Sequence, residues 1–240
     1  MIRQIFAVLL ALCVLFSAVL CFADDLDDDD LDEDEDGIET LDDGYEEEEQ
    51  TVDFKTVSTY NIETITEGYF NLKMNADHTG AILTSYTGED SEVIFPETVK
   101  DGIPVVAIDD GMCSDNPKIE NIRIPGSIKT IGNAAFARCP KLKSVIIEEG
   151  VLSLGMCCFG GCPELTDVNL PNSIEIVDNF VFARCIALEE VVFGTELQSI
   201  GIEAFRGCIN LRKITIPGGD NVSFGDGIFD ECPDEVEIAN

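Results

Sequence analysis

Cysteines at a fixed interval are the residues with the most chemistry to offer in this 240-residue chain. A thiolate can act as a nucleophile or bind zinc, and two thiols can form a disulfide. Here the interval is the same three times in succession, from Cys139 through Cys162 and Cys185 to Cys208. A period of about 23 residues is typical of stacked coils, in which each coil places the same side chain beside that of its neighbour.

Stacking makes disulfides between these cysteines unfavourable. Equivalent side chains on neighbouring coils lie about 4.8 Å apart with parallel Cβ vectors, whereas a disulfide needs Cβ atoms that converge to about 3.8 Å. A free cysteine packs as a small apolar residue. Cys157 and Cys158 lie outside the series, and a disulfide, if one forms, would involve one of them. The predicted structural ladder consists of Asn116, Cys139, Cys162, Cys185, Cys208 and Cys232.

The other reactive side chains form no catalytic or metal-binding pattern. His78 is the only histidine and falls in a predicted turn, which excludes histidine-based triads and multi-histidine zinc sites. The run Cys157-Cys158-x-x-x-Cys162 has no second cysteine pair at zinc spacing. We therefore expect no catalytic residue, no metal site and no cofactor, and we do not interpret the chain as an enzyme.

One acidic stretch resembles the beginning of a calcium-binding loop, Asp32-x-Asp34-x-Asp36-Gly37. Glu39 and Asp43 stand where such a loop has an apolar residue and a bidentate glutamate, and no helical pattern flanks the stretch. We interpret it as an acidic run with loosely associated cations.

The positions around the cysteines repeat with the same step and indicate the elements of each coil. Within one coil, Leu142-x-x-Val145-x-Ile147 has the alternation of a short strand, and Ala135-Phe136 fits a single helical or 3₁₀ turn. Prolines such as Pro171 end the strands, because proline cannot continue a ladder. The apolar columns are Phe136, Phe159, Phe182 and Phe205; Leu142, Leu165, Leu188 and Leu211; and Ile131, Leu154, Val177 and Ile200.

Residues 1–23 are typical of a secretory signal peptide. A short basic start precedes a long apolar run, and the small residues Cys21 and Ala23 favour cleavage before Asp24. An uncleaved membrane anchor and a lipid anchor on Cys21 are the alternatives. Each of them exports residues 24–240, so we expect a secreted or cell-surface protein with no membrane contact beyond such an N-terminal anchor.

The net charge of −34 has two sources. Residues 24–50 hold 18 of the 48 acids and no base, which predicts a disordered acidic spacer. Residues 51–240 still carry 30 acids against 13 bases. A surface of this sign repels phosphates, so we exclude nucleic acid as a partner, and we expect a monomer.

Residues 51–95 are predicted to form an N-terminal β-hairpin cap. The apolar Phe70, Leu72 and Met74 alternate with polar residues, a turn follows at 75–80, and the chain returns over 81–86. Residues 96–240 then form the solenoid, with about five coils of about 23 residues each. A hairpin is expected at 100–102 in the first coil. The last coil has a longer step, which ends at Cys232, and the polar Glu235, so we expect it to act as a cap.

The repeat resembles the BspA-type leucine-rich repeat family over residues 94–238. The matching unit reads Ile124-Pro125-x-x-Ile128-x-x-Ile131-Gly132-x-x-Ala135-Phe136-x-x-Cys139-x-x-Leu142-x-x-Val145-x-Ile147. The resemblance implies an α/β-type repeat solenoid, a leucine-rich-repeat horseshoe segment with a parallel β-sheet on one face. It also implies a bacterial or protist surface protein linked to adhesion or host-protein binding.

The exposed side of the predicted sheet is the best candidate for binding, because solenoids use extended sheet faces for recognition. One residue per coil forms a column there. We predict an exported, non-catalytic binding or adhesion module that recognises an extracellular protein or glycan through this face. The alternative is a structural or colonisation-related surface protein without a single specific partner. The predicted partner-binding column is Arg123, Ile146, Asn169, Val192 and Thr215.

The thiol ladder leads to a direct test. Titration of the denatured, unreduced protein should find at least about four free sulfhydryls, because ladder positions are too far apart to be bridged. A smaller number would reject the ladder.

Overall fold

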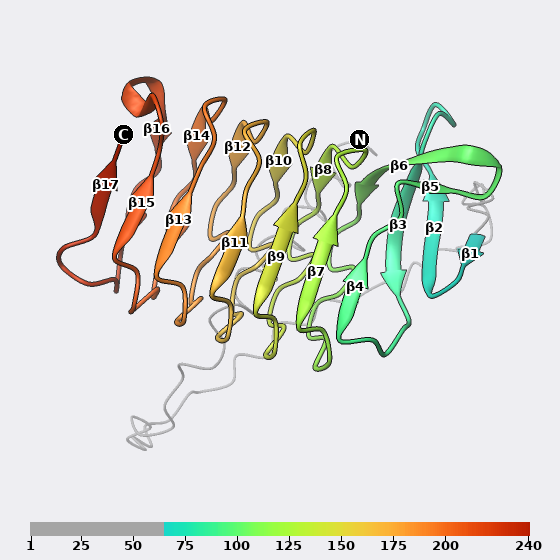
Figure 1. Cartoon of the computed structure of the whole chain (residues 1–240), viewed down its shortest axis with the longest axis horizontal. Coiled ribbons are helices and arrows are strands. Elements are labelled where there is room, and N and C mark those ends of the chain that lie inside the picture. Colours follow the sequence, from blue (N-terminus) through green and yellow to red (C-terminus); the bar gives the residue numbers. More distant parts are fainter. Residues whose placement is uncertain (1–64) are drawn as a thin grey trace, which may run out of the picture.

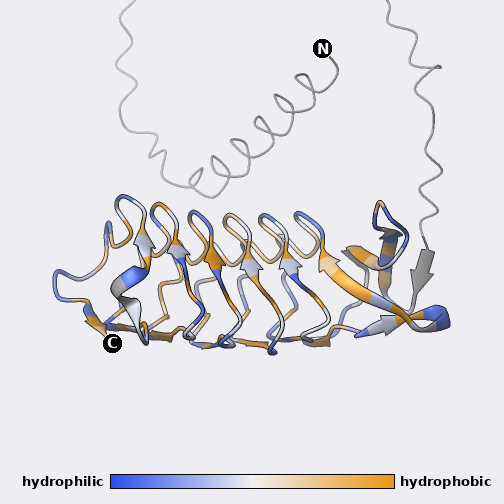
Figure 2. Ribbon diagram, turned by 90° about the horizontal axis from the view of Figure 1, so that it is seen from above, coloured by the Kyte–Doolittle hydropathy of each residue, from blue (hydrophilic) through white to orange (hydrophobic). Residues whose placement is uncertain are grey.

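The structure is a computed structural model that describes residues 65–240. The predicted signal peptide, the acidic spacer and the first part of the predicted cap lie outside the described residues. Each successive coil contributes one short strand to each of two sheets, and the coils repeat side by side along the long axis of the molecule (Figures 1 and 2).

The two sheets are called the front sheet and the back sheet. The front sheet has seven strands, β4 (Glu92–Ile94), β7 (Asn121–Ile124), β9 (Ser144–Ile147), β11 (Asp167–Asn169), β13 (Glu190–Val192), β15 (Lys213–Thr215) and β17 (Glu237–Ala239). The back sheet follows the order β1 (Ile65–Glu67), β2 (Phe70–Met74), β3 (Ala81–Tyr86), β6 (Ile103–Ile108), β8 (Thr130–Ile131), β10 (Ser153–Leu154), β12 (Ile176–Val177), β14 (Ser199–Ile200) and β16 (Ser223–Phe224), with β5 (Thr98–Val99) paired to β6.

The strand register confirms the predicted period. In the front sheet Val145 lies beside Ile122 and Val168, which are its equivalents one period earlier and one period later in the sequence. All the strands of that sheet run parallel. The last step, from Ile214 in β15 to Ile238 in β17, is one residue longer than the regular step of the coils between β7 and β15. The front sheet has two strands more than the five coils predicted, so the parallel-sheet solenoid is longer than expected.

A stack of phenylalanine rings fills the space between the sheets. Phe136, Phe159, Phe182 and Phe205 are fully buried, and neighbouring rings lie 5.4 to 5.8 Å apart. Their planes differ by 15° or less. Because each ring covers the ring of the next coil, aromatic contacts add to the free energy gained by removing apolar surface from water.

The predicted helical turn is wrong. The bend around Ala135-Phe136 consists of β-turns, in which Ala134 and Arg138 have φ values of 50° and 54°. Alternate amides donate to the next coil: Ala134 N to Met156 O at 2.7 Å, and Phe136 N to Cys158 O at 2.8 Å. A helical turn would direct these amides to its own carbonyls, so hydrogen bonding between coils excludes it. The solenoid therefore has almost no helix; two 3₁₀ segments, η3 (Lys100–Gly102) and η4 (Gly219–Asn221), are described.

The N-terminal strands β2 and β3 form a hairpin, and they also join the solenoid. Strands β2 and β3 pair antiparallel, and Asn75 Oδ1 accepts hydrogen bonds from Thr79 N and Gly80 N in the turn between them. Strand β3 then pairs parallel with β6, and β4 pairs parallel with β7. Both sheets thus begin before Pro96. The small hairpin of β5 and β6 lies around Lys100–Gly102, as the sequence indicates.

Within residues 65–240, none of the helical segments has the length and apolar composition of a bilayer-spanning helix.

The phenylalanine stack should dominate stability. We expect Phe159→Ala to lower the free energy of unfolding by about 3–5 kcal/mol, because the substitution leaves a cavity between two rings. Phe224→Ala is the matched control, since Phe224 is 44% exposed at the outer end of the back sheet. Chemical denaturation of the two variants measures the difference, and equal losses would mean that the stack does not hold the coils together.

Candidate functional site

The outer face of the front sheet brings the five predicted binding residues into one row. Side chains alternate between the core and the outside along each strand, and the parallel register places equivalent positions next to each other. Ile94 and Ala239 extend the row at its two ends. The complete row, called the front column, is Ile94, Arg123, Ile146, Asn169, Val192, Thr215 and Ala239.

Apolar and polar residues alternate along the front column. Ile94, Ile146 and Val192 are 63%, 41% and 54% exposed, with Arg123 and Asn169 between them. Sequence reasoning missed Ile94 because the hairpin inserted at 100–102 makes the step from Ile94 to Arg123 longer than the period of the other coils. The alternation Glu92-Val93-Ile94 was the signal that pointed to a strand there.

A second outward row, two residues earlier on each strand, is mainly polar and acidic. We call it the acidic column: Glu92, Asn121, Ser144, Asp167, Glu190, Lys213 and Glu237. The face therefore offers aliphatic side chains next to carboxylates.

The bases of this face are already paired with acids. Arg123 lies 2.6 Å from Glu148 Oε1, and Lys213 lies 3.2 Å from Glu237 Oε1. Lys143 and Arg212, next to the strand starts, pair with Glu120 and Glu189. The hydrogen bond from Lys143 lowers the pKa of Glu120 below its usual range, as expected for a carboxylate beside a cation.

Three carboxylates of the acidic column keep their charge unmatched. Among the described residues, Glu92, Asp167 and Glu190 have no ion pair. Asp167 accepts a hydrogen bond from the Thr166 hydroxyl at 2.7 Å. Because Arg123, Lys143, Arg212 and Lys213 are neutralised by their own partners, and Lys141 is the one further base beside Glu120, the three carboxylates give the face a net negative field.

The front sheet is only partly closed between β11 and β13. At the junction before it, Lys143 O accepts hydrogen bonds from Thr166 N and Asp167 N, and at the junction after it Glu189 O accepts from Arg212 N and Lys213 N. Within the described residues, no backbone amide of β13 donates an equivalent hydrogen bond to Thr166 O. These two strands are paired at a single position, Asn169 with Val192.

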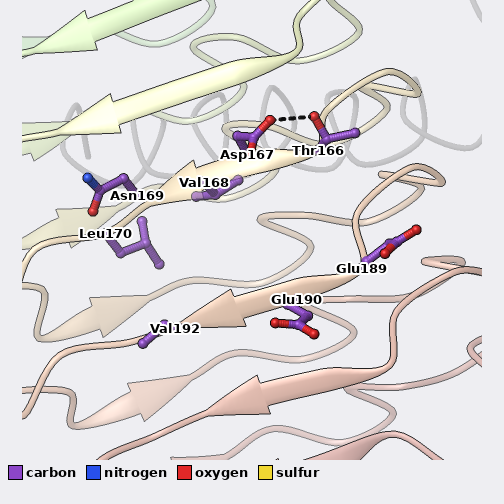
Figure 3. A pocket seen from close by; sticks show the side chains of 8 residues that line it. All are labelled: Thr166, Asp167, Val168, Asn169, Leu170, Glu189, Glu190 and Val192. Carbon is purple, nitrogen blue, oxygen red and sulfur yellow. Dashed lines mark hydrogen bonds between the residues drawn. The ribbon is translucent and has the colours of Figure 1, made fainter.

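A hollow of about 480 Å³ lies at this seam. The carboxylates of Asp167, Glu189 and Glu190 surround one end of it, and Leu170 and Val192 lie at the other (Figure 3). Like charges on neighbouring strands repel, which agrees with the opening beside Asp167 and Glu190. Two smaller hollows, of about 260 and 120 Å³, lie on the same face near Ile94 and Arg123.

The predicted ladder residues lie inside the solenoid, away from this face. Each ladder thiol donates to a carbonyl of the preceding coil, for example Cys162 Sγ to Phe136 O and Cys185 Sγ to Phe159 O, both at 3.2 Å. Cys139, Cys208 and Cys232 make equivalent bonds. Asn116 instead uses its side-chain oxygen, which accepts from Lys118 N and Ile119 N.

The ladder thiols are poorly suited to chemistry. Burial raises the pKa of the ladder thiols Cys162 and Cys208, and of Cys158 outside the ladder, so these three thiols stay protonated and are weak nucleophiles. The hydrogen bond with Cys162 lowers the pKa of Cys139, which is nevertheless fully buried and closed to a substrate. All eight cysteines of the described part are free, and Cys232 is the one that is not fully buried. No group of three His, Cys, Asp or Glu side chains in residues 65–240 is arranged to hold a metal.

Comparison with known proteins shows that the chain is similar to bacterial leucine-rich repeat proteins in sequence and in fold. The family profile described as BspA type Leucine rich repeat region matches residues 106–235 as six copies. No curated protein matches the sequence. The profile and the similar structures below indicate no enzyme family.

Several solved structures resemble the chain. A leucine rich cell surface protein from Faecalibacterium prausnitzii A2-165 is 26% identical, with a TM-score of 0.62 over 72% of this chain and 53% of its own. The T. pallidum Leucine Rich Repeat protein is also 26% identical, with a TM-score of 0.63 over 72% of this chain and 92% of its own. A leucine-rich repeat protein from Eubacterium ventriosum is 26% identical, with a TM-score of 0.55 over 73% and 51%. This chain thus spans about half the length of the Faecalibacterium protein.

The open seam can be detected by hydrogen exchange. The Glu190 amide lacks the carbonyl partner that Asp167 N and Lys213 N have, so it should exchange with deuterium at least about tenfold faster than either of those amides. Residue-resolved exchange measured by NMR tests this. Equal protection of all three amides would mean that the strands are closed in solution.

Proposed function

Because the chain belongs to the BspA-type leucine-rich repeat family, we propose that it is an exported, non-catalytic binding or adhesion module that recognises a protein or glycan through the outer face of its front sheet. The observation that carries this proposal is the front column. It aligns Ile94, Ile146 and Val192 as exposed aliphatic side chains on one continuous face, and scattered apolar residues would form no such row.

Location at the cell surface or in the surrounding medium is part of the proposal. The Faecalibacterium relative is described as a cell surface protein, and residues 1–23 of this chain have the composition of a signal peptide. Residues 24–50 would then act as an acidic spacer before the folded part. We propose that the module works as a monomer, because copies that carry 30 acids against 13 bases in residues 51–240 repel each other.

A binding role also agrees with what the described side chains offer. Seven of the eight thiols of residues 65–240 are buried, His78 lies in a turn, and no group of three His, Cys, Asp or Glu side chains in these residues is arranged to hold a metal. Shape and surface charge are therefore the properties through which this protein can act on another molecule.

The pair of aliphatic side chains at the centre of the face provides the test. Ile146→Asp plus Val192→Asp should remove saturable capture of a partner by the immobilised protein, because each substitution puts a charge into an apolar contact. Leu152→Asp plus Ile176→Asp is the matched control: Leu152 directly precedes β10 and Ile176 lies in β12 of the back sheet, and the two residues are 38% and 45% exposed.

The proposal requires loss in the front-sheet variant and retention in the control. If capture is unchanged in the front-sheet variant, the chosen face is wrong. Capture that never saturates and is equal for both variants would instead favour a structural surface protein without a specific partner.

A further inference from the structure

The outer face of the front sheet has a charge pattern that restricts its partner. The bases on or beside this face, Arg123, Lys143, Arg212 and Lys213, are held in ion pairs with acids of this chain. Among the described residues beside this face, an acidic partner would find Lys141, an exposed base near Glu120, outside these ion pairs, so it would meet far fewer unpaired bases than carboxylates. A basic partner meets unmatched carboxylates on three strands of the acidic column, Glu92, Asp167 and Glu190.

The seam between β11 and β13 adds acceptors to this pattern. Asp167 and Glu190 both line the hollow from the two strands, and Thr166 O accepts no backbone hydrogen bond from β13. Lysine and arginine side chains carry only donors, so they match a hollow that offers mainly acceptors. Val192, which is 54% exposed at the other end of the hollow, is suited to the alkyl part of such a side chain, and Leu170 beside it is largely buried (Figure 3).

The same face is less suited to a glycan. Sugar rings present C–H groups that pack on flat aromatic surfaces, yet neither the front column nor the acidic column contains an aromatic residue. The exposed side chains of the front column are aliphatic, as in contacts between protein segments.

Resting on the proposed function, we propose that the front sheet docks a basic protein segment. Apolar side chains of that segment cover Ile146 and Val192 of the front column. Its lysine or arginine side chains lie against Asp167 and Glu190 at the seam. Complementary charge then guides the encounter and sets the register, while the aliphatic contacts give the complex its lifetime.

A synthetic peptide serves as the probe. An extended peptide of about ten residues rises about 3.3 Å per residue and therefore spans seven strands that are about 4.8 Å apart. The probe alternates lysine with valine. A second peptide has glutamate in place of every lysine. Binding of each to the whole protein is measured by calorimetry at physiological salt.

Two pairs of carboxylate-to-amide substitutions remove the same charge at different places. Asp167→Asn plus Glu190→Gln changes the seam. Asp101→Asn plus Asp226→Asn is the control, since both aspartates are exposed and lie outside the front sheet. The seam variant should bind the lysine peptide about tenfold more weakly, whereas the control should stay within about twofold of the unmodified protein. Melting temperatures verify that both variants fold.

Each other outcome overturns the inference. Equal weakening by the two variants would mean unspecific attraction to an acidic protein. If the glutamate peptide binds as tightly as the lysine peptide, or if the lysine peptide does not bind, the partner of this face is not a basic segment. If the natural partner is lost in the Ile146→Asp and Val192→Asp variant but kept in the seam variant, the proposed function stands and only this inference fails. If the natural partner still binds to both variants, the outer face of the front sheet is not the binding site.

Discussion

Registration of each coil on the next is the constraint on which the rest of this structure depends. The strands of the back sheet beyond β6 are two residues long, and such strands have no stability alone. They persist because amides in the bends donate to carbonyls of the adjacent coil and because each phenylalanine ring covers the next. A single coil is therefore stable only when it packs against the adjacent coils.

The binding face is a product of the same registration. A shift of one residue between coils would turn Ile146 and Val192 toward the core and Val145 and Val191 toward water. The fold thus positions the face without any residue devoted to that purpose. Register also explains how an open seam is tolerated: behind β11 and β13 the back sheet keeps Ile176 beside Ser199 and Val177 beside Ile200, so the coils stay aligned.

Much of this arrangement was predictable from the sequence, because a constant step requires equivalent residues to line up whatever their local geometry. The turns were not predictable in the same way. Ala134 and Arg138 are ordinary L-residues that adopt positive φ, and rules based on residue type favour a helical turn for them. The early start of the sheets was hidden by the insertion at 100–102, which interrupts the period. The seam lies where β13 donates no backbone hydrogen bond to Thr166 O. In the sequence it is indicated only by two acids, Asp167 and Glu190, that occupy equivalent positions in successive coils.

The ladder of thiols has a consequence for the lifetime of the molecule. In a closed solenoid Cys139, Cys162, Cys185 and Cys208 are fully buried, so an oxidising medium does not reach their sulfur atoms. Once heat or force peels a coil away, several thiols become reactive together and can crosslink in non-native pairs. Oxidation then converts a reversible opening into permanent damage. Damage to the protein would therefore accumulate irreversibly, because a closed coil keeps its thiols unreactive and an opened coil exposes them to oxidation.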